Sequence, residues 1–207
     1  MKIFTAFLLF TLGCCTIAPA LAQNIEPCKS EFMGDYYRGV DEIINKAIGH
    51  QSQLSITTIP SFSAESGLRL VGNDVYFVQL KASVWANSFV MDGPGRGHND
   101  FSSPHAATTV YRAALSPEIA SRIKQLYVNA ITNAKESDRM GLDGVTYRMA
   151  IPAGGCAETW SPEPQSPDGR LVELIELLSA HARLSQPRAM QRSEEVIVRL
   201  LATMGQR

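Results

Sequence analysis

Residues 141–162 read GLDGVTYRMAIPAGGCAETWSP, and this stretch predicts the sheet around which the rest of the chain folds. From Val145 to Ile151, apolar side chains at every second position alternate with smaller or more polar ones, which is the pattern of a half-buried strand. Residues 152–155, PAGG, favour a chain reversal, so Cys156–Trp160 becomes the return strand. We therefore expect a β-hairpin with one face made of Cys156, Glu158 and Trp160.

This face of the hairpin has two possible roles. If it is exposed, Trp160 beside the carboxylate of Glu158 could form part of a binding groove, because surface aromatic residues often anchor partners. If it is buried, Trp160 fills the core of the hairpin and Glu158 lies at its rim. We favour the core position and keep both residues as candidates for binding.

Residues 1–22, MKIFTAFLLFTLGCCTIAPALA, have the layout of a secretory signal, with a lysine, an apolar run, a proline and small residues before Gln23. A membrane-spanning helix needs roughly 20 consecutive apolar residues, and this run is shorter and ends at Pro19. We therefore expect cleavage before Gln23, no membrane span in the mature chain, and a periplasmic or secreted protein. Cys14 follows Leu12-Gly13 as in bacterial lipoproteins, but Thr11 replaces the usual aliphatic residue, so lipid anchoring is the minor alternative.

Cleavage changes the cysteine count, because Cys14 and Cys15 leave with the signal and only Cys28 and Cys156 remain. Two cysteines in an oxidising compartment are expected to form a disulfide. The bond would close a long loop, which chain-entropy models value at roughly 4–5 kcal/mol as an upper estimate. The alternative is a nucleophilic Cys156, which would need a lowered pKa and a nearby base, and no histidine lies close to it in sequence.

The composition is that of one ordinary soluble domain. The chain has 207 residues and a net charge of −1, so the part after the signal has the usual size of a single domain. A balanced charge cannot attract a phosphate backbone, and we expect no nucleic-acid partner. Common hydrolase motifs, such as Gly-x-Ser-x-Gly and His-Glu-x-x-His, are missing, and nothing in the chain points to a cofactor.

Periodic patterns predict the remaining elements and an α+β fold. Apolar residues at helical spacing predict four helices, over about 35–49, 117–134, 167–185 and 189–204. Alternating patterns predict five further strands, over 54–59, 67–71, 75–82, 84–91 and 108–115. We expect an antiparallel sheet, made of a meander and the C-terminal hairpin, with the helices packed on one side.

The segment from Asp92 to His105 is the most unusual loop of the chain. Three glycines and a proline between 92 and 100 predict irregular, exposed backbone, and functional sites often lie in such loops. Its polar groups suit contact with a partner or an anion, although a solvated connector is the simpler interpretation. The segment is not a P-loop, and its few ligands are weak support for a metal site. The candidate binding residues are Arg96, His98, Asp100 and His105.

The region from about 109 to 184 resembles a pattern in exported bacterial proteins of uncharacterised function. The pattern consists of a helix opened by Ser116-Pro117, then Leu142-Asp143-Gly144-Val145-Thr146-Tyr147, then Cys156-Ala157-Glu158-Thr159-Trp160-Ser161-Pro162 and a leucine-rich helix. The resemblance implies a shared structural hairpin. It brings no catalytic residues and no substrate.

Taken together, the export signal and the missing catalytic templates favour a binding or interaction protein of the cell envelope, with another envelope protein or a small ligand as its partner. The alternative is an envelope hydrolase that uses His98, Asp100 and His105, with Glu158 as a further candidate. A purely structural envelope component would instead expose a broad apolar patch.

Overall fold

The computed structural model describes residues 25–29, 33–93, 95–102, 105–136 and 143–204. The predicted signal sequence and the first two residues of the stretch 141–162 lie outside this part of the chain. The strands are β1 (Glu26–Pro27), β2 (Leu54–Pro60), β3 (Ser66–Val71), β4 (Asp74–Leu80), β5 (Phe89–Gly93), β6 (Arg96–Asn99), β7 (Thr108–Ala114), β8 (Val145–Ala150) and β9 (Cys156–Trp160). The helices are α1 (Gly34–Ile48), α2 (Val84–Asn87), α3 (Pro117–Thr132), α4 (Pro167–Ala182) and α5 (Pro187–Met204).

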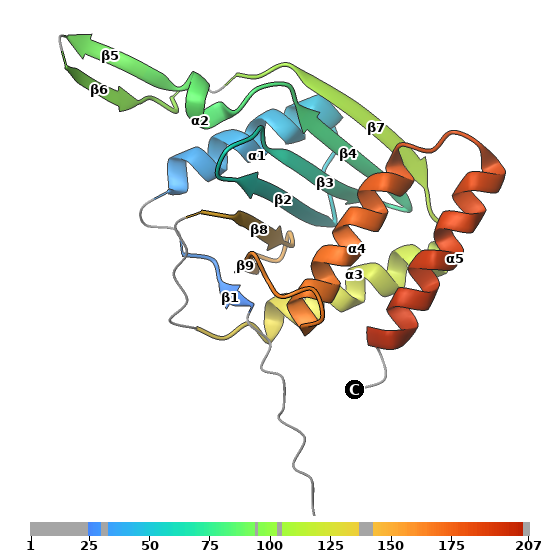
Figure 1. Cartoon of the computed structure of the whole chain (residues 1–207). Helices are drawn as coiled ribbons and strands as arrows, with labels where there is room; N and C mark the ends of the chain where they lie inside the picture. Colours follow the sequence, from blue (N-terminus) through green and yellow to red (C-terminus); the bar gives the residue numbers. More distant parts are fainter. Residues whose placement is uncertain (1–24, 30–32, 94, 103–104, 137–142, 205–207) are drawn as a thin grey trace, which may run out of the picture.

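Seven of the strands form one antiparallel sheet in the order β1-β9-β8-β2-β3-β4-β7 (Figure 1). The two remaining strands, β5 and β6, form a separate hairpin. The predicted α+β fold with a meander and a C-terminal hairpin is therefore confirmed. Among the described residues, no helix combines the length and the apolar character needed to cross a membrane.

The helix ends follow the capping chemistry that the sequence predicts. Ser116 and Ser166 are extended and precede helices that begin at a proline. The hydroxyl of Ser166 also accepts a hydrogen bond from Gly169 N at 3.0 Å, which satisfies one free N–H of the first turn. Gly49 ends α1 in the left-handed conformation, with φ of 72°.

The hairpin β8–β9 lies near one edge of the sheet and is held to the N-terminal segment. β8 pairs with β2, and Met149 and Ala157 are buried in the main core. Cys28 and Cys156 form the predicted disulfide, with their Cα atoms 5.4 Å apart. This bond fixes β1 beside β9, so that β1 forms the edge of the sheet on that side.

The expectation that all helices pack on one side of the sheet is wrong. Helices α3, α4 and α5 cover one face, whereas α1 covers the opposite face (Figure 1). The central strand β4 shows the reason, because its side chains are buried on both faces: Val75 and Phe77 lie toward α4, and Tyr76 and Val78 lie toward α1. A strand buried on both faces is a continuous apolar run, and residues 75–78 have this character.

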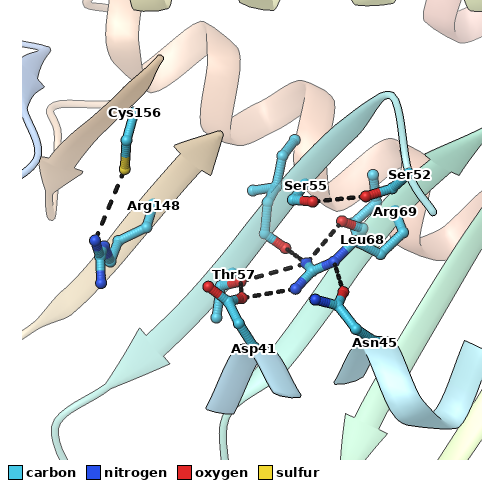
Figure 2. Close-up of polar contacts among 10 residues, drawn as sticks. Asp41, Asn45, Ser52, Ser55, Thr57, Leu68, Arg69, Arg148 and Cys156 are labelled. Atoms are coloured by element: carbon cyan, nitrogen blue, oxygen red, sulfur yellow. Dashed lines mark hydrogen bonds and ion pairs between the residues drawn. The ribbon is translucent and has the colours of Figure 1, made fainter. Parts of the chain in front are cut away.

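A buried arginine joins α1 to the sheet. The Arg69 side chain is 1% exposed, and its guanidinium donates to Asp41 Oδ1 at 2.6 Å and to Asn45 Oδ1 at 2.9 Å (Figure 2). The same group donates to the carbonyl oxygen of Ile56 at 2.9 Å. Desolvation lowers the pKa of Arg69, and Asp41 opposes this shift. The network is fully hydrogen-bonded and fixes the position of α1 over β2 and β3.

Candidate functional site

The hairpin β5–β6, which we call the arm, projects away from the sheet (Figure 1). The sequence predicts irregular backbone here, and this prediction is wrong, because Phe89 pairs with Asn99, Val90 with His98 and Met91 with Gly97. The glycines do not prevent the strands. Gly95 has φ of 74° and supplies the turn, and Gly97 leaves the space over which the ring of Phe89 lies.

A buried carboxylate holds the base of the arm. The predicted strand over 84–91 is wrong in its first half, because Val84–Asn87 forms the short helix α2. Glu65 is fully buried, and its carboxylate accepts hydrogen bonds from Val84 N at 2.9 Å and from the Ser83 hydroxyl at 3.0 Å. It also accepts one from the Tyr36 hydroxyl at 2.5 Å. Glu65 thus anchors α2 to α1, and the pKa of Tyr36 is raised by burial and by this carboxylate.

A second set of hydrogen bonds connects the end of the arm to α2. Asn99 Nδ2 donates to the carbonyl oxygen of Trp85 at 2.8 Å and to the Ser88 hydroxyl at 2.7 Å. Asp100 N donates to the carbonyl oxygen of Ser88 at 2.8 Å. The arm therefore leaves the body of the protein from a hydrogen-bonded base and is not a free loop.

One face of the arm is apolar and exposed. Phe89 and Met91 are 55% and 59% exposed, and their side chains flank Gly97 on the neighbouring strand. A two-stranded hairpin is marginal in water unless its apolar face is covered. Large apolar side chains that are exposed on a projecting element are typical of a contact surface.

The other face of the arm is mainly polar, although it also carries Val90, which is 42% exposed. His98, which is paired with Val90, has its Nδ1 atom 2.7 Å from Asp92 Oδ2. Both side chains are exposed. An exposed histidine with a carboxylate partner can take up or release a proton or hold a polar ligand.

A cavity of about 450 Å³ opens between this polar face and the start of α1. It is lined by the loop from His98 to Ser102 and by residues of α1, namely Asp35, Arg38, Gly39 and Glu42. Arg38 forms an ion pair with Asp35, so Glu42 and Asp100 give the cavity an acidic balance. The pKa of Asp100 is lowered, chiefly because its carboxylate accepts a hydrogen bond from Ser102 N.

The structure brings only some of the predicted loop residues together. His98 and Asp100 line the cavity, whereas Arg96 is exposed on the arm beside the turn and does not line it. His105 is exposed on the segment that leads to β7 and also lies outside the lining of the cavity. No group of histidine, cysteine and acidic side chains among the described residues is arranged to hold a metal ion.

Glu158 and Trp160 belong to a separate cluster beside the disulfide. Glu158 Oε2 lies 3.4 Å from Arg148 Nε, and the Arg148 guanidinium lies 3.9 Å from the centre of the Tyr37 ring. Desolvation raises the pKa of Glu158 although Arg148 opposes the shift. Arg148 also contacts Cys156 Sγ at 3.7 Å (Figure 2).

The prediction that Trp160 fills the core is wrong. The side chain is 36% exposed and lies over Gly144, where an added Cβ would come within 2.8 Å of the indole. Trp160 is at the end of β9, paired with Thr146. It lies at the surface, two residues after Glu158 on β9, which pairs with Arg148.

Sequence reasoning missed the part of the site that α1 contributes. Asp35, Arg38 and Glu42 are spaced by three and four residues, which places them on one face of a helix. A charged helix face is usually solvated, so the spacing of these residues does not indicate that they line a cavity with the loop from His98 to Ser102. Glu65 was missed as well, because its partners, Tyr36 and residues 83–85, lie far from it in sequence on either side and nothing local indicates them.

Comparisons of the chain with protein-family models, with curated proteins and with solved structures find no match in any of the three. The function is therefore argued from the geometry of the arm and the cavity.

Proposed function

We propose that the protein is an exported binding protein of the cell envelope and that the arm contacts a partner protein. The observation that carries the proposal is the exposure of Phe89 and Met91 on a hairpin whose base is held by Glu65. Exposing apolar side chains costs free energy in water, roughly 25 cal/mol for each Å² of apolar surface. A partner that covers this face would recover that free energy, which explains why the arm is apolar.

The cavity at the base of the arm suggests the chemistry of the partner. Contact with the arm would bring part of the partner over the opening that His98 and Asp100 line. Because Glu42 and Asp100 make the opening acidic, a lysine or arginine side chain fits it best. We therefore propose a partner with an apolar patch beside a basic residue.

Two observations support an extracytoplasmic location. A disulfide such as Cys28–Cys156 is typical of proteins in an oxidising compartment, and residues 1–22 have the layout of a secretory signal. We propose that the mature chain begins at Gln23 and works in the periplasm or outside the cell.

The proposal is tested by affinity capture with the mature protein and detergent extracts of the cell envelope. The variant Phe89→Ser/Met91→Ser removes the apolar face and keeps the backbone of the arm. Val198→Ser is the matched control, because Val198 is also exposed but lies on α5. We expect the arm variant to capture at least about ten times less partner than the wild type, as for the loss of a binding hot spot. The control should capture as much as the wild type.

Glu42→Gln/Asp100→Asn tests the cavity in the same assay. Capture that becomes weaker and less dependent on salt would support a basic contact. Equal capture by the wild type and by the arm variant would contradict the proposed role of the arm.

A second candidate function, an envelope hydrolase, is favoured by one observation. His98 lines the cavity and its Nδ1 lies 2.7 Å from Asp92, so the other ring nitrogen could act as a general base. Ser102 lines the same cavity and carries a hydroxyl. Turnover of ester or peptide probes by the mature protein, abolished in His98→Ala and reduced in Asp92→Asn, would establish this function; equal background rates for all three proteins would reject it.

A further inference from the structure

The seven-stranded sheet ends in two different edges. At one edge, β1 is only two residues long and is fixed by the disulfide at Cys28. At the other edge, β7 has seven residues and pairs with β4 on one side only. An open edge strand is a template for pairing with another chain, and proteins usually shorten, bend or charge such edges.

The hydrogen-bond pattern shows which groups of β7 are available. Lys81 N donates to the carbonyl oxygen of Ala107, and Leu115 N donates to that of Asn73, both at 2.8 Å. The odd-numbered residues of β7 therefore direct their main-chain groups toward β4, and the even-numbered residues direct theirs outward. The outward carbonyl of Ala114 already accepts a hydrogen bond from His181 Nε2 at 3.0 Å. In the described part of the chain, the outward groups of Thr108, Val110 and Arg112 have no main-chain partner.

The side chains of β7 do not protect this edge. Residues 108–114, TTVYRAA, contain no proline, glycine or lysine, and threonine, valine and tyrosine are good strand formers. The one charged residue, Arg112, contacts the neighbouring strand β4 of its own chain. Its Nη2 atom lies 2.7 Å from Asp74 Oδ2, and its guanidinium lies over the ring of Tyr76. Val110, in the middle of the strand, is 40% exposed.

We infer that β7 is a dimerisation edge and that it pairs in antiparallel fashion with β7 of a second copy, about a two-fold axis at Val110. In this register Val110 faces Val110 of the other copy, and Thr108 faces Arg112. Thr108, Val110 and Arg112 of the two strands then exchange about six backbone hydrogen bonds. These bonds pair every outward N–H and C=O group of the three residues.

The register also explains why the partner is a second copy. A two-fold pairing centred on Val110 places two β-branched side chains in a cross-strand pair, which stabilises sheets. It places each Arg112 opposite a threonine, so no like charges meet. Moving the axis to Tyr111 would bring Ala114 opposite Thr108, and the carbonyl of Ala114 is already bonded to His181. The register centred on Val110 is therefore self-complementary and avoids the Ala114 carbonyl.

Cysteine cross-linking of the mature protein tests this register. Hydrogen-bonded residues of antiparallel strands have Cα atoms about 5.5 Å apart, which is within the range that a disulfide spans. Val110→Cys should therefore form a covalent dimer under mild oxidation. Thr108→Cys alone should not, because the two copies of residue 108 would be about 13 Å apart along the strands, whereas a mixture of Thr108→Cys and Arg112→Cys should cross-link.

Sedimentation analysis of the unmodified protein gives the second readout. We expect a concentration-dependent dimer, which Val110→Lys converts to a monomer and Val198→Lys on α5 leaves intact. The variant Phe89→Ser/Met91→Ser should also remain dimeric, because the arm is not part of this interface. A monomer at every concentration, or cross-linking of Thr108→Cys as efficient as that of Val110→Cys, would overturn the inference without affecting the proposed role of the arm.

Discussion

The disulfide between Cys28 and Cys156 should contribute a large share of the stability of the fold. The two cysteines are 128 residues apart in sequence, and the loop-closure relation for a loop of that length gives about 5 kcal/mol at 25 °C. The bond holds a short segment, because β1 forms two residue pairs with β9 and its other main contacts are the burial of Ile25 and the hydrogen bond from Lys135 N to the Ile25 carbonyl at 3.0 Å. The double variant Cys28→Ser/Cys156→Ser should therefore lose up to about 5 kcal/mol of unfolding free energy.

The loss of unfolding free energy is measured by urea unfolding, and the shift of the melting temperature by thermal unfolding, of the mature wild type and the double serine variant. For a domain of this size, 1 kcal/mol shifts the melting temperature by about 2–4 °C, so the expected decrease is about 10–20 °C. Hydrogen exchange should show β1 and Cys28 opening from β9, while α4 keeps its protection. A double variant as stable as the wild type, or two free thiols in the denatured, unreduced wild type, would refute the reasoning.

Three further perturbations test the buried charges. Arg69→Ala should cost about 3–5 kcal/mol in urea unfolding, because Asp41 and the carbonyl oxygen of Ile56 lose the guanidinium and the volume of the side chain is left empty. Arg69→Met removes the same donors but fills part of that volume, so it should cost less; a cost below about 1 kcal/mol for Arg69→Ala would contradict the network. Glu65→Ala should cost about 2–3 kcal/mol and speed amide exchange in the arm, and unchanged exchange there would contradict its anchoring role. Burial raises the pKa of Glu158, so its contribution to stability is full below the ordinary glutamate pKa and is lost as the pH rises through the raised one. Glu158→Gln should therefore gain stability relative to the wild type as the pH rises above the ordinary glutamate pKa, and a difference that is flat or of opposite sign would contradict this.

The parts of the fold that depend on local periodicity could be predicted from the sequence. The hairpin β8–β9 follows from the alternation after Val145, and α3 and α4 begin where Ser-Pro pairs place them. The disulfide follows from counting the cysteines that remain after export. The residues that determine the hairpin and the helices lie within a few positions of each element. For the disulfide, Cys28 and Cys156 are the only cysteines expected to remain after export.

The remaining features depend on contacts between distant residues. Residues 84–87 are helical because Glu65 accepts their N–H groups, and the alternation around Trp85 could not indicate a carboxylate from an earlier loop. The cavity likewise needs α1 and the loop after His98 to meet. Trp160 illustrates the same limit: an alternating pattern shows which side chains share a face, but not which part of that face another element covers.

The proposed contact between the apolar face of the arm and a partner is best tested by site-specific photo-cross-linking in living cells. A photoreactive phenylalanine analogue is placed at Met91 on the arm and, as a control, at Val198 on α5, which is also exposed. We expect a discrete cross-linked product from position 91 that Phe89→Ser weakens, and no such product from position 198. A position 91 that yields only the uncross-linked chain, under conditions where the exported protein is abundant and folded, would contradict it.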